Sequence, residues 1–250
     1  MKKYYALLLP CFLVVLCACS KDAATSNTNQ SSHNGAGGSM ARFTVAANHL
    51  YLVDDYQLLA YDVSDAARPE FRSAQDVGFS IETIFPYRNK LFIGSATGMF
   101  VYSIDEPANP KLEGSVNHLR ACDPVVGNDT VAYVTLRSFG TTCGSLQNVL
   151  NVYDLHNTAS PLLVKTVDMS APFGLGSSGN ALYVCDGPGG LAVFDISKPY
   201  EPERIRTIEG EDFRDVIPYG EILICHTATG FRFYRISDPL QPQPAGIVND

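Results

Sequence analysis

The sequence lacks the short motifs that identify common metal sites and nucleophilic enzymes. It has no Cys-x-x-Cys pair, no His-x-His or His-Glu-x-x-His spacing, and no Gly-x-Ser-x-Gly turn. Zinc ribbons, thioredoxin-like proteins, zinc proteases and serine hydrolases need such spacings to bring ligands or nucleophiles together. We therefore expect no metal, no cofactor and no catalytic residues, and an enzyme is disfavoured.

Basic residues and helical periodicity are also scarce. The chain has 18 Lys and Arg against 26 Asp and Glu, a formal charge of −8, which becomes −10 if Lys2 and Lys3 leave with a signal peptide. Such a chain repels polyanions, so we expect no nucleic-acid partner. No stretch after residue 39 has the 3.6-residue apolar period of an amphipathic helix, which predicts an all-β domain.

The N-terminus has the pattern of a secretory signal. Lys2 and Lys3 precede an apolar run over residues 4–18 that is too short to cross a membrane as a mature helix. The run ends in Leu16-Cys17-Ala18-Cys19, which resembles the lipobox of bacterial lipoproteins. The resemblance implies that residues 1–18 are removed and that Cys19 carries lipid such as palmitate. Because Ser20 rather than Asp follows, it also implies an outer-membrane lipoprotein, periplasmic or surface-exposed. The alternative is an ordinary signal peptide.

Residues 19–39 and 40–250 differ in composition. Ser, Asn, Thr, Gly and Ala dominate the first stretch, which has almost no large apolar side chain. It cannot bury enough surface to order itself, so we expect a flexible tether after the lipidated cysteine. Residues 40–250 have the length of a single domain.

That domain is built from repeats of about 41 residues. Five apolar strands each contain an aromatic residue eight positions before a proline, and the aromatic residues are spaced by 41, 51, 41 and 40 positions. They are Tyr61, Tyr102, Tyr153, Phe194 and Tyr234. Each unit contains four short strand candidates, and the middle two are apolar at nearly every position, as in a sheet covered on both faces. A radial stack supplies that cover, so the sequence predicts a five-bladed β-propeller. An open β-solenoid is the alternative.

The repeated core also resembles a known family. Val193-Phe194-Asp195-Ile196-Ser197 followed by Pro199 and Pro202 is similar to the LVIVD repeat of secreted and lipid-anchored bacterial proteins, and the other units vary the same core. The resemblance implies a propeller-like fold and brings no catalytic motif with it. Ser103 and Arg235 replace the core Asp in the second and fifth units.

Four cysteines remain in the domain, in an oxidising compartment that preserves disulfides. The third unit is about ten residues longer than the others, and alignment places the excess over residues 137–148. Cys143 lies there, and Cys122 lies at the start of the same unit on the same side, so we predict a Cys122–Cys143 disulfide. Cys185 and Cys225 occupy what we interpret as equivalent places in neighbouring units. Sheets packed about 10 Å apart would keep them separate, so we predict free thiols.

Polar residues gather at one end of the predicted channel, where the innermost strands begin and the second strands end. We call this end the mouth. Its candidate binding residues are Arg42, Glu82, Asp123, Arg137, Asp186, Arg214, Asp215 and His226. Convergence of polar groups on one concavity favours ligand binding, whereas mutual neutralisation would make the same residues a structural charge network.

These patterns predict a lipid-anchored, non-catalytic scaffold that binds a protein or glycan partner in the cell envelope. The alternative is a carbohydrate-active enzyme that uses Glu82, Asp123 and Asp215, because glycosidases use paired carboxyl groups. A channel closed by Phe173 and salt bridges would favour the scaffold. A structural accessory of a larger envelope assembly is the third possibility.

Overall fold

The computed structural model describes residues 38–117, 124–138 and 147–250, and within these residues the chain forms strands, turns and loops without a helix. Five four-stranded antiparallel sheets follow one another along the chain, each with its strands in sequential order. None of the described residues belongs to a helix long and apolar enough to span a membrane. The predicted all-β architecture of five four-stranded units is confirmed.

The strands of the five sheets are as follows. The first sheet has β1 (Phe43–Ala46), β2 (His49–Val53), β3 (Gln57–Asp62) and β4 (Glu70–Asp76). The second has β5 (Ile81–Tyr87), β6 (Lys90–Ser95), β7 (Gly98–Ser103) and β8 (Lys111–Asn117). The third has β9 (Val125–Gly127), β10 (Val131–Leu136), β11 (Val149–Asp154) and β12 (Leu162–Asp168). The fourth has β13 (Leu175–Ser178), β14 (Ala181–Cys185), β15 (Leu191–Asp195) and β16 (Glu203–Ile208). The fifth has β17 (Phe213–Tyr219), β18 (Ile222–Thr227), β19 (Gly230–Arg235) and β20 (Gln243–Asn249).

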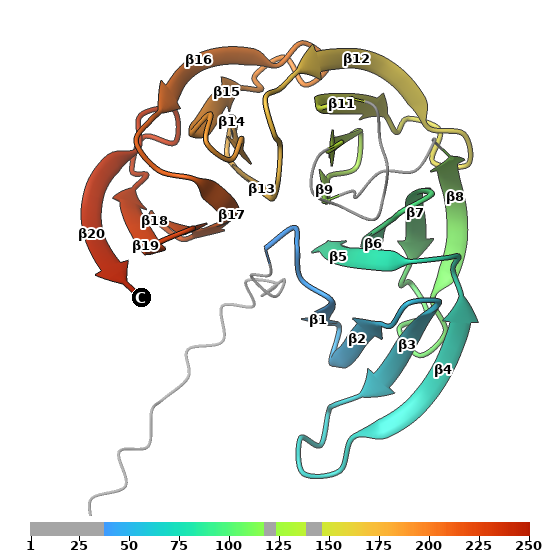
Figure 1. Cartoon of the computed structure of the whole chain (residues 1–250). Coiled ribbons are helices and arrows are strands. Elements are labelled where there is room, and N and C mark those ends of the chain that lie inside the picture. Colours follow the sequence, from blue (N-terminus) through green and yellow to red (C-terminus); the bar gives the residue numbers. More distant parts are fainter. Residues whose placement is uncertain (1–37, 118–123, 139–146) are drawn as a thin grey trace, which may run out of the picture. The chain divides into compact units, whose positions relative to one another are not determined.

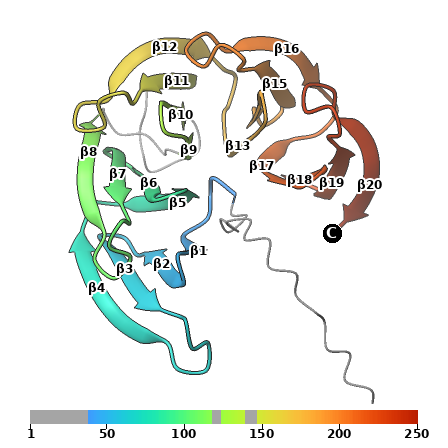
Figure 2. The same cartoon turned by 180° about the vertical axis from the view of Figure 1, so that it is seen from behind.

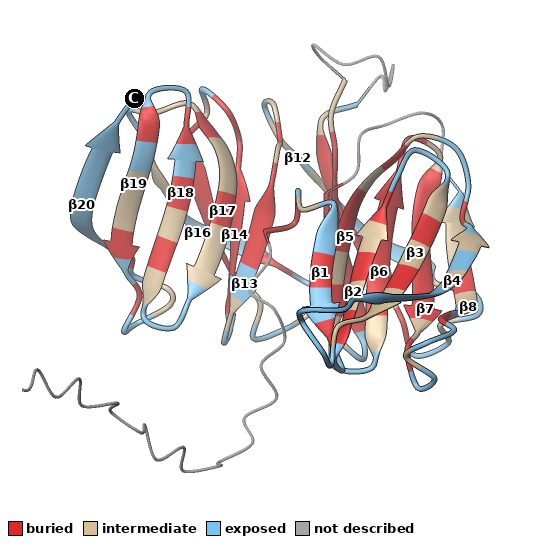
Figure 3. Cartoon of the chain, turned by 90° about the horizontal axis from the view of Figure 1, so that it is seen from below, coloured by how far each residue is buried: buried red, intermediate tan, exposed pale blue. Residues whose placement is uncertain are grey.

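The sheets are arranged radially, with the first strand of each sheet innermost and the fourth outermost (Figures 1 and 2). The innermost strands contact their neighbours in the order β1, β5, β9, β13, β17. Every residue of β10 and β14 is buried. β20 is exposed along its whole length (Figure 3). Strands that are apolar on both sides therefore lie where other sheets cover both sides.

Four apolar clusters fill the spaces between successive sheets. One lies between the first and second sheets, and the others lie between the second and third, third and fourth, and fourth and fifth. The fifth sheet does not pack on the first in the same way. Phe43 and Val45 on β1 are 64% and 45% exposed, and Phe231 on β19 is 38% exposed. The blades thus have a five-bladed layout whose ring is not closed between its first and last sheets.

The repeated aromatic position marks the same backbone irregularity in all five sheets. In each sheet the register between the third and fourth strands shifts just before it, for example between Val193 and Phe194. A bulge at this point bends the strand and increases its twist, which suits the curved outer strand of a blade. The core Asp closes the following turn, because the carboxylates of Asp62, Asp154 and Asp195 each accept the N–H two residues on. Ser103 does the same through its hydroxyl.

A tyrosine in the second strand connects three of the sheets to the next one. The hydroxyl groups of Tyr51, Tyr133 and Tyr183 donate to the carbonyl oxygens of Pro107, Pro199 and Pro239, at 2.9, 2.8 and 2.6 Å. Each proline lies three residues before the repeat proline of the next unit. The register places Ile224 at the equivalent position of the fifth sheet, where no hydroxyl is available.

The two cysteines of the fourth and fifth sheets are free thiols, as predicted, but the reason given for that prediction is wrong. Val184 pairs with Ala192, whereas Cys185 pairs with Leu191. Cys225 pairs with Arg232, so its equivalent in the fourth sheet is Val184 and not Cys185. The one-residue offset turns the two thiols toward the same apolar cluster, and both are buried there. Burial raises the pKa of both thiols, and the nearby Cys225 raises the pKa of Cys185 further.

We predict that Tyr183→Phe lowers the free energy of unfolding by about 1 kcal/mol, because the Pro239 carbonyl loses its partner between two sheets. Urea denaturation measures the change. Tyr219→Phe is the matched control, because Tyr219 is 65% exposed and should shift stability by no more than about 0.5 kcal/mol. Equal effects of the two substitutions would show that the contact between the sheets does not contribute.

Candidate functional site

A short segment ahead of β1 passes through the middle of the blades. Gly38 and Ser39 are buried, although both were expected to belong to the tether. The Ser39 hydroxyl accepts the Leu175 N–H at 2.7 Å, and the Ala41 carbonyl accepts the Ile84 N–H at 2.8 Å. The segment of residues 38–41, the axial segment, thus joins β13 to β5, which belong to different sheets.

Two glycines make room for a carboxylate at the centre. A side chain on Gly38 would place its first carbon 2.6 Å from Asp215 Oδ2, and one on Gly174 would place it 2.2 Å from Asp215 Oδ1. Both distances are shorter than real contacts of that carbon, so Asp215 requires glycine on either side. The Asp215 carboxylate also accepts the Val216 N–H at 2.9 Å. Asp215 is therefore packed against the axial segment and the start of β13.

An aromatic ring between two guanidinium groups occupies the mouth. The Phe173 ring lies 3.7 Å from the Arg137 guanidinium carbon and 4.6 Å from that of Arg214. Its backbone is fixed on both sides, because Thr135 donates to the Phe173 carbonyl and the Phe173 N–H donates to Cys185. Cation–π contacts of this kind stabilise a ring more when they are shielded from water. The cavity beside Phe173 and Glu82 is only about 70 Å³, whereas a cavity of about 250 Å³ is lined by Asp215 and His226.

Burial and charge have opposite effects on the carboxyl groups of the mouth. Burial raises the pKa of Glu82, and the nearby charges of Arg137 and Arg42 oppose the rise. Burial raises the pKa of Asp215 to about 6, against the Val216 hydrogen bond and the charge of His226. The central space is thus a place where ionisation is costly, and the arginines around it offset part of that cost.

The other predicted mouth residues have different partners. Asp186 is buried and accepts the N–H groups of Ser170 and Ala171, so it holds the loop before β13. Arg42 pairs with Asp55 at 2.9 Å, and Arg214 pairs with Asp212. His226 is exposed, with its ring 5.2 Å from that of Phe231. Asp123, Cys122 and Cys143 lie outside the described residues, as do Cys19 and the predicted tether up to residue 37.

The structure thus brings Glu82, Arg137, Arg214 and Asp215 together around Phe173 and the axial segment. Among the residues that the structure describes, no group of three or more His, Cys, Asp or Glu could hold a metal ion. Sequence reasoning missed the axial segment, because a Gly-Ser pair at the end of a polar stretch is typical of a linker. The buried glycines beside Asp215 become recognisable only once the blades are placed around it.

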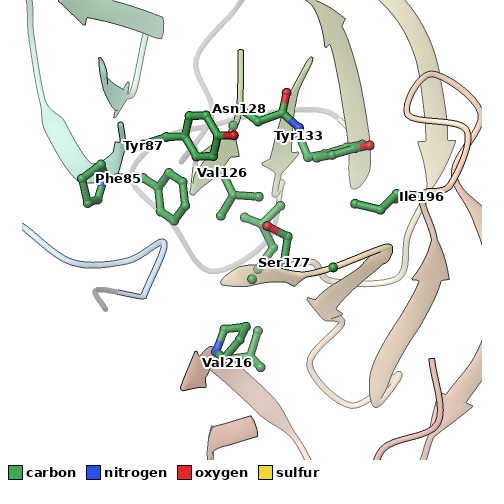
Figure 4. A pocket seen from close by; sticks show the side chains of 14 residues that line it. Phe85, Tyr87, Val126, Asn128, Tyr133, Ser177, Ile196 and Val216 are labelled. Carbon is green, nitrogen blue, oxygen red and sulfur yellow. The ribbon is translucent and has the colours of Figure 1, made fainter. Parts of the chain in front are cut away.

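A second and larger cavity lies at the opposite end of the innermost strands (Figure 4). Its volume is about 430 Å³. Its lining includes residues near the ends of β5, β9 and β17 and most of β13, whereas Glu82 and Thr83 at the start of β5 line the mouth cavity. We call it the far-end cavity. Sequence reasoning missed it as well, since Phe85 and Tyr87 alternate along β5 as ordinary core residues do.

The raised pKa of Asp215 predicts a pH-dependent stability. The folded pKa of about 6 exceeds the ordinary value of 3.8, so the folded state holds the proton more tightly and loses stability as pH rises from about 4 to about 6. We expect Asp215→Asn to raise the free energy of unfolding at pH 8 by about 1–3 kcal/mol and to have little effect below pH 4. Urea denaturation at both pH values tests this, with the exposed Asp168→Asn as control. A difference that stays constant with pH would contradict burial as the cause.

Comparisons with known proteins agree with the fold. The LVIVD repeat matches residues 176–206, so the resemblance is confirmed in the fourth unit. No curated protein matches the sequence. Among solved structures, a functionally unknown protein from Desulfotomaculum acetoxidans is similar, with a TM-score of 0.68, 9% identity, and coverage of 82% of this chain and 68% of its own.

Two further structures are similar over most of this chain. A protein from Lactobacillus plantarum has a TM-score of 0.61 and 11% identity over 82% of this chain and 69% of its own. BamB from Moraxella catarrhalis has a TM-score of 0.58 and 10% identity over 78% of this chain and 56% of its own. The chain thus spans between about half and about two thirds of the length of these structures. At such identities the likeness concerns the fold alone. The chain therefore carries an LVIVD repeat within a propeller-like array of five four-stranded sheets.

Proposed function

We propose that the chain is a lipid-anchored, non-catalytic scaffold of the bacterial outer membrane that binds a protein or glycan partner in the envelope. The proposal rests on one observation: residues at the mouth are packed against other residues of the chain. Phe173 lies between Arg137 and Arg214, and Asp215 is packed against Gly38 and Gly174. Charged groups engaged in this way support the packing of the blades, and a repeat fold of this type supports a scaffold role.

The alternative, a carbohydrate-active enzyme using the mouth carboxyl groups, receives less support. Glycosidases place a sugar between two carboxyl groups that are about 5–10 Å apart. The cavity beside Glu82 is about 70 Å³, well below the ~300 Å³ of typical small-molecule sites. Asp215 is packed against Gly38 and Gly174, and the cavity that it lines with His226 is about 250 Å³, also below that range.

The anchor is tested by cell fractionation. We predict that Cys19→Ala moves the protein from the membrane to the soluble envelope fraction, because acyl chains contribute roughly 0.8 kcal/mol per buried methylene. Cys17→Ala is the matched control, since Cys17 would leave with the signal and the protein should stay in the membrane. Membrane retention of the Cys19 variant would rule out lipidation at this residue.

The scaffold role is tested by affinity capture from detergent-solubilised envelope with the full chain as bait. Arg42→Glu alters the rim of the mouth through a solvent-exposed pair that contributes about 0–1 kcal/mol, so the melting temperature should change little. We expect this variant to lose a captured partner that binds at the mouth. The Arg137→Glu variant should instead lose stability, because it places a second negative charge beside the half-buried Glu82. Stable, undiminished capture by the Arg42 variant would contradict a binding role of the mouth.

A further inference from the structure

The far-end cavity has the construction of a ligand site. Residues from the second, third, fourth and fifth sheets surround it, so its shape depends on the packing of four blades and not on one flexible loop. Its volume of about 430 Å³ lies within the ~300–1,000 Å³ range of small-molecule sites. It shares no lining residue with the mouth cavity.

The axial segment is adjacent to the cavity, because Ser39 binds the N–H of Leu175, which lines the cavity, and Gly38 lies close to Ile217, which is adjacent to the lining Val216 and Pro218. Beyond the axial segment, Phe173 and the two arginines fill the mouth.

The lining combines aromatic rings with uncharged polar groups. Phe85 and Tyr87 project from β5 on one side, and Ser177 on β13 lies on another (Figure 4). The Ser177 side chain is exposed, and Phe85 and Tyr87 are partly exposed although they belong to an innermost strand. Asn128 uses its Oδ1 atom to bind the N–H groups of Thr130 and Val131, so its Nδ2 group is the part of the amide that can donate to a ligand.

None of the fourteen lining residues carries a charge, and the charged groups next to them, Arg88 over the Tyr87 ring and Asp129, are paired with each other. Phosphates, carboxylates and ammonium groups lose hydration on entering such a site and gain no opposite charge, which disfavours nucleotides, anionic sugars and peptide termini. A purely apolar ligand would leave the amide and hydroxyl groups without partners, which is also unfavourable. The matching ligand has apolar faces for the aromatic rings and neutral hydroxyl groups for Asn128, Ser177 and Tyr87. A neutral saccharide has both.

We propose that the far-end cavity binds a neutral saccharide, with its ring against Phe85 and Tyr87 and its hydroxyl groups bonded to Asn128 and Ser177. This inference deepens the proposed scaffold function by naming a glycan as the partner, and it rests on that function for its setting. It depends neither on the lipid anchor nor on the mouth.

The experiment uses the full chain purified in detergent. The chain has no tryptophan, so Tyr87→Trp introduces a single fluorescent reporter that keeps an aromatic face at the cavity. The probes are maltotriose, cellotriose and triacetylchitotriose, with anionic 3′-sialyllactose as the charged comparison. We expect at least one neutral trisaccharide to change the fluorescence with a dissociation constant below about 1 mM, and sialyllactose to have no effect.

Two further variants, made in the reporter background, test the cavity itself. Phe85→Leu keeps an apolar side chain but removes the aromatic face, and Ser177→Glu adds bulk and charge at an exposed position that should tolerate it. Each should weaken binding at least tenfold, whereas Arg68→Gln, at an exposed position of the first unit outside both cavities, should leave it unchanged. Circular dichroism confirms that each variant is folded.

The proposal is overturned if no neutral trisaccharide binds up to its solubility limit, or if binding persists in the folded Ser177→Glu variant. A response to sialyllactose equal to that of the neutral sugars, or to proline-rich peptides alone, would overturn it too. Failure here with successful capture of a protein partner would leave the scaffold function standing, so the two proposals are distinguishable.

Discussion

Packing of each sheet against the next is the interaction on which the rest of the structure depends. A single four-stranded sheet with β14 and β15 at its centre would leave apolar side chains exposed on both faces, and such a sheet is not stable alone in water. The four clusters between successive sheets remove that surface from water. The strand order, the radial arrangement and the central space all follow from this requirement.

Much of this arrangement is predictable from the sequence, because its signals are local and repeated. The second unit illustrates it. Apolar runs bounded by polar pairs predict strands from Ile81 and Lys90, and the structure has β5 and β6 beginning at these residues. The direction of individual side chains is less predictable. The repeat pattern predicts equivalent places for Cys185 and Cys225, yet a one-residue difference in register turns them to opposite faces of their own sheets and hence toward each other.

The candidate sites also have some features that the sequence predicts and others that it does not. The charged residues of the mouth are predictable, because strand direction alone determines that Glu82 and Asp215 lie at the same end. The contacts of these charged residues are not predictable, because they depend on the axial segment. From the sequence alone, Gly38 and Ser39 resemble a linker, and only the structure shows that Gly38 lies against Asp215 and that Ser39 binds Leu175. The far-end cavity was missed for a related reason. Phe85 has the pattern of a core residue, and only the curvature of the blades leaves its ring beside an opening.

The junctions between sheets also explain where the ring is open. Three junctions have both a tyrosine donor and a proline carbonyl, as at Tyr183 and Pro239. From the fifth sheet to the first, Ile224 stands at the donor position and Ala66 at the acceptor position, so neither side has the repeated partner. The second and third sheets also lack the pair, with Phe92 and Thr158, but there a full apolar cluster joins them.

The axial segment makes contacts that compensate for the missing packing between the fifth and first sheets. By bonding to Leu175 in the fourth sheet and Ile84 in the second, it connects blades on two sides of the central space. It also packs against Asp215 of the fifth sheet, whose outer face has no following blade. The stability of the last sheet thus depends on residues that precede the first. The contacts that hold Gly38 and Ser39 at the centre of the blades therefore belong to the fold itself.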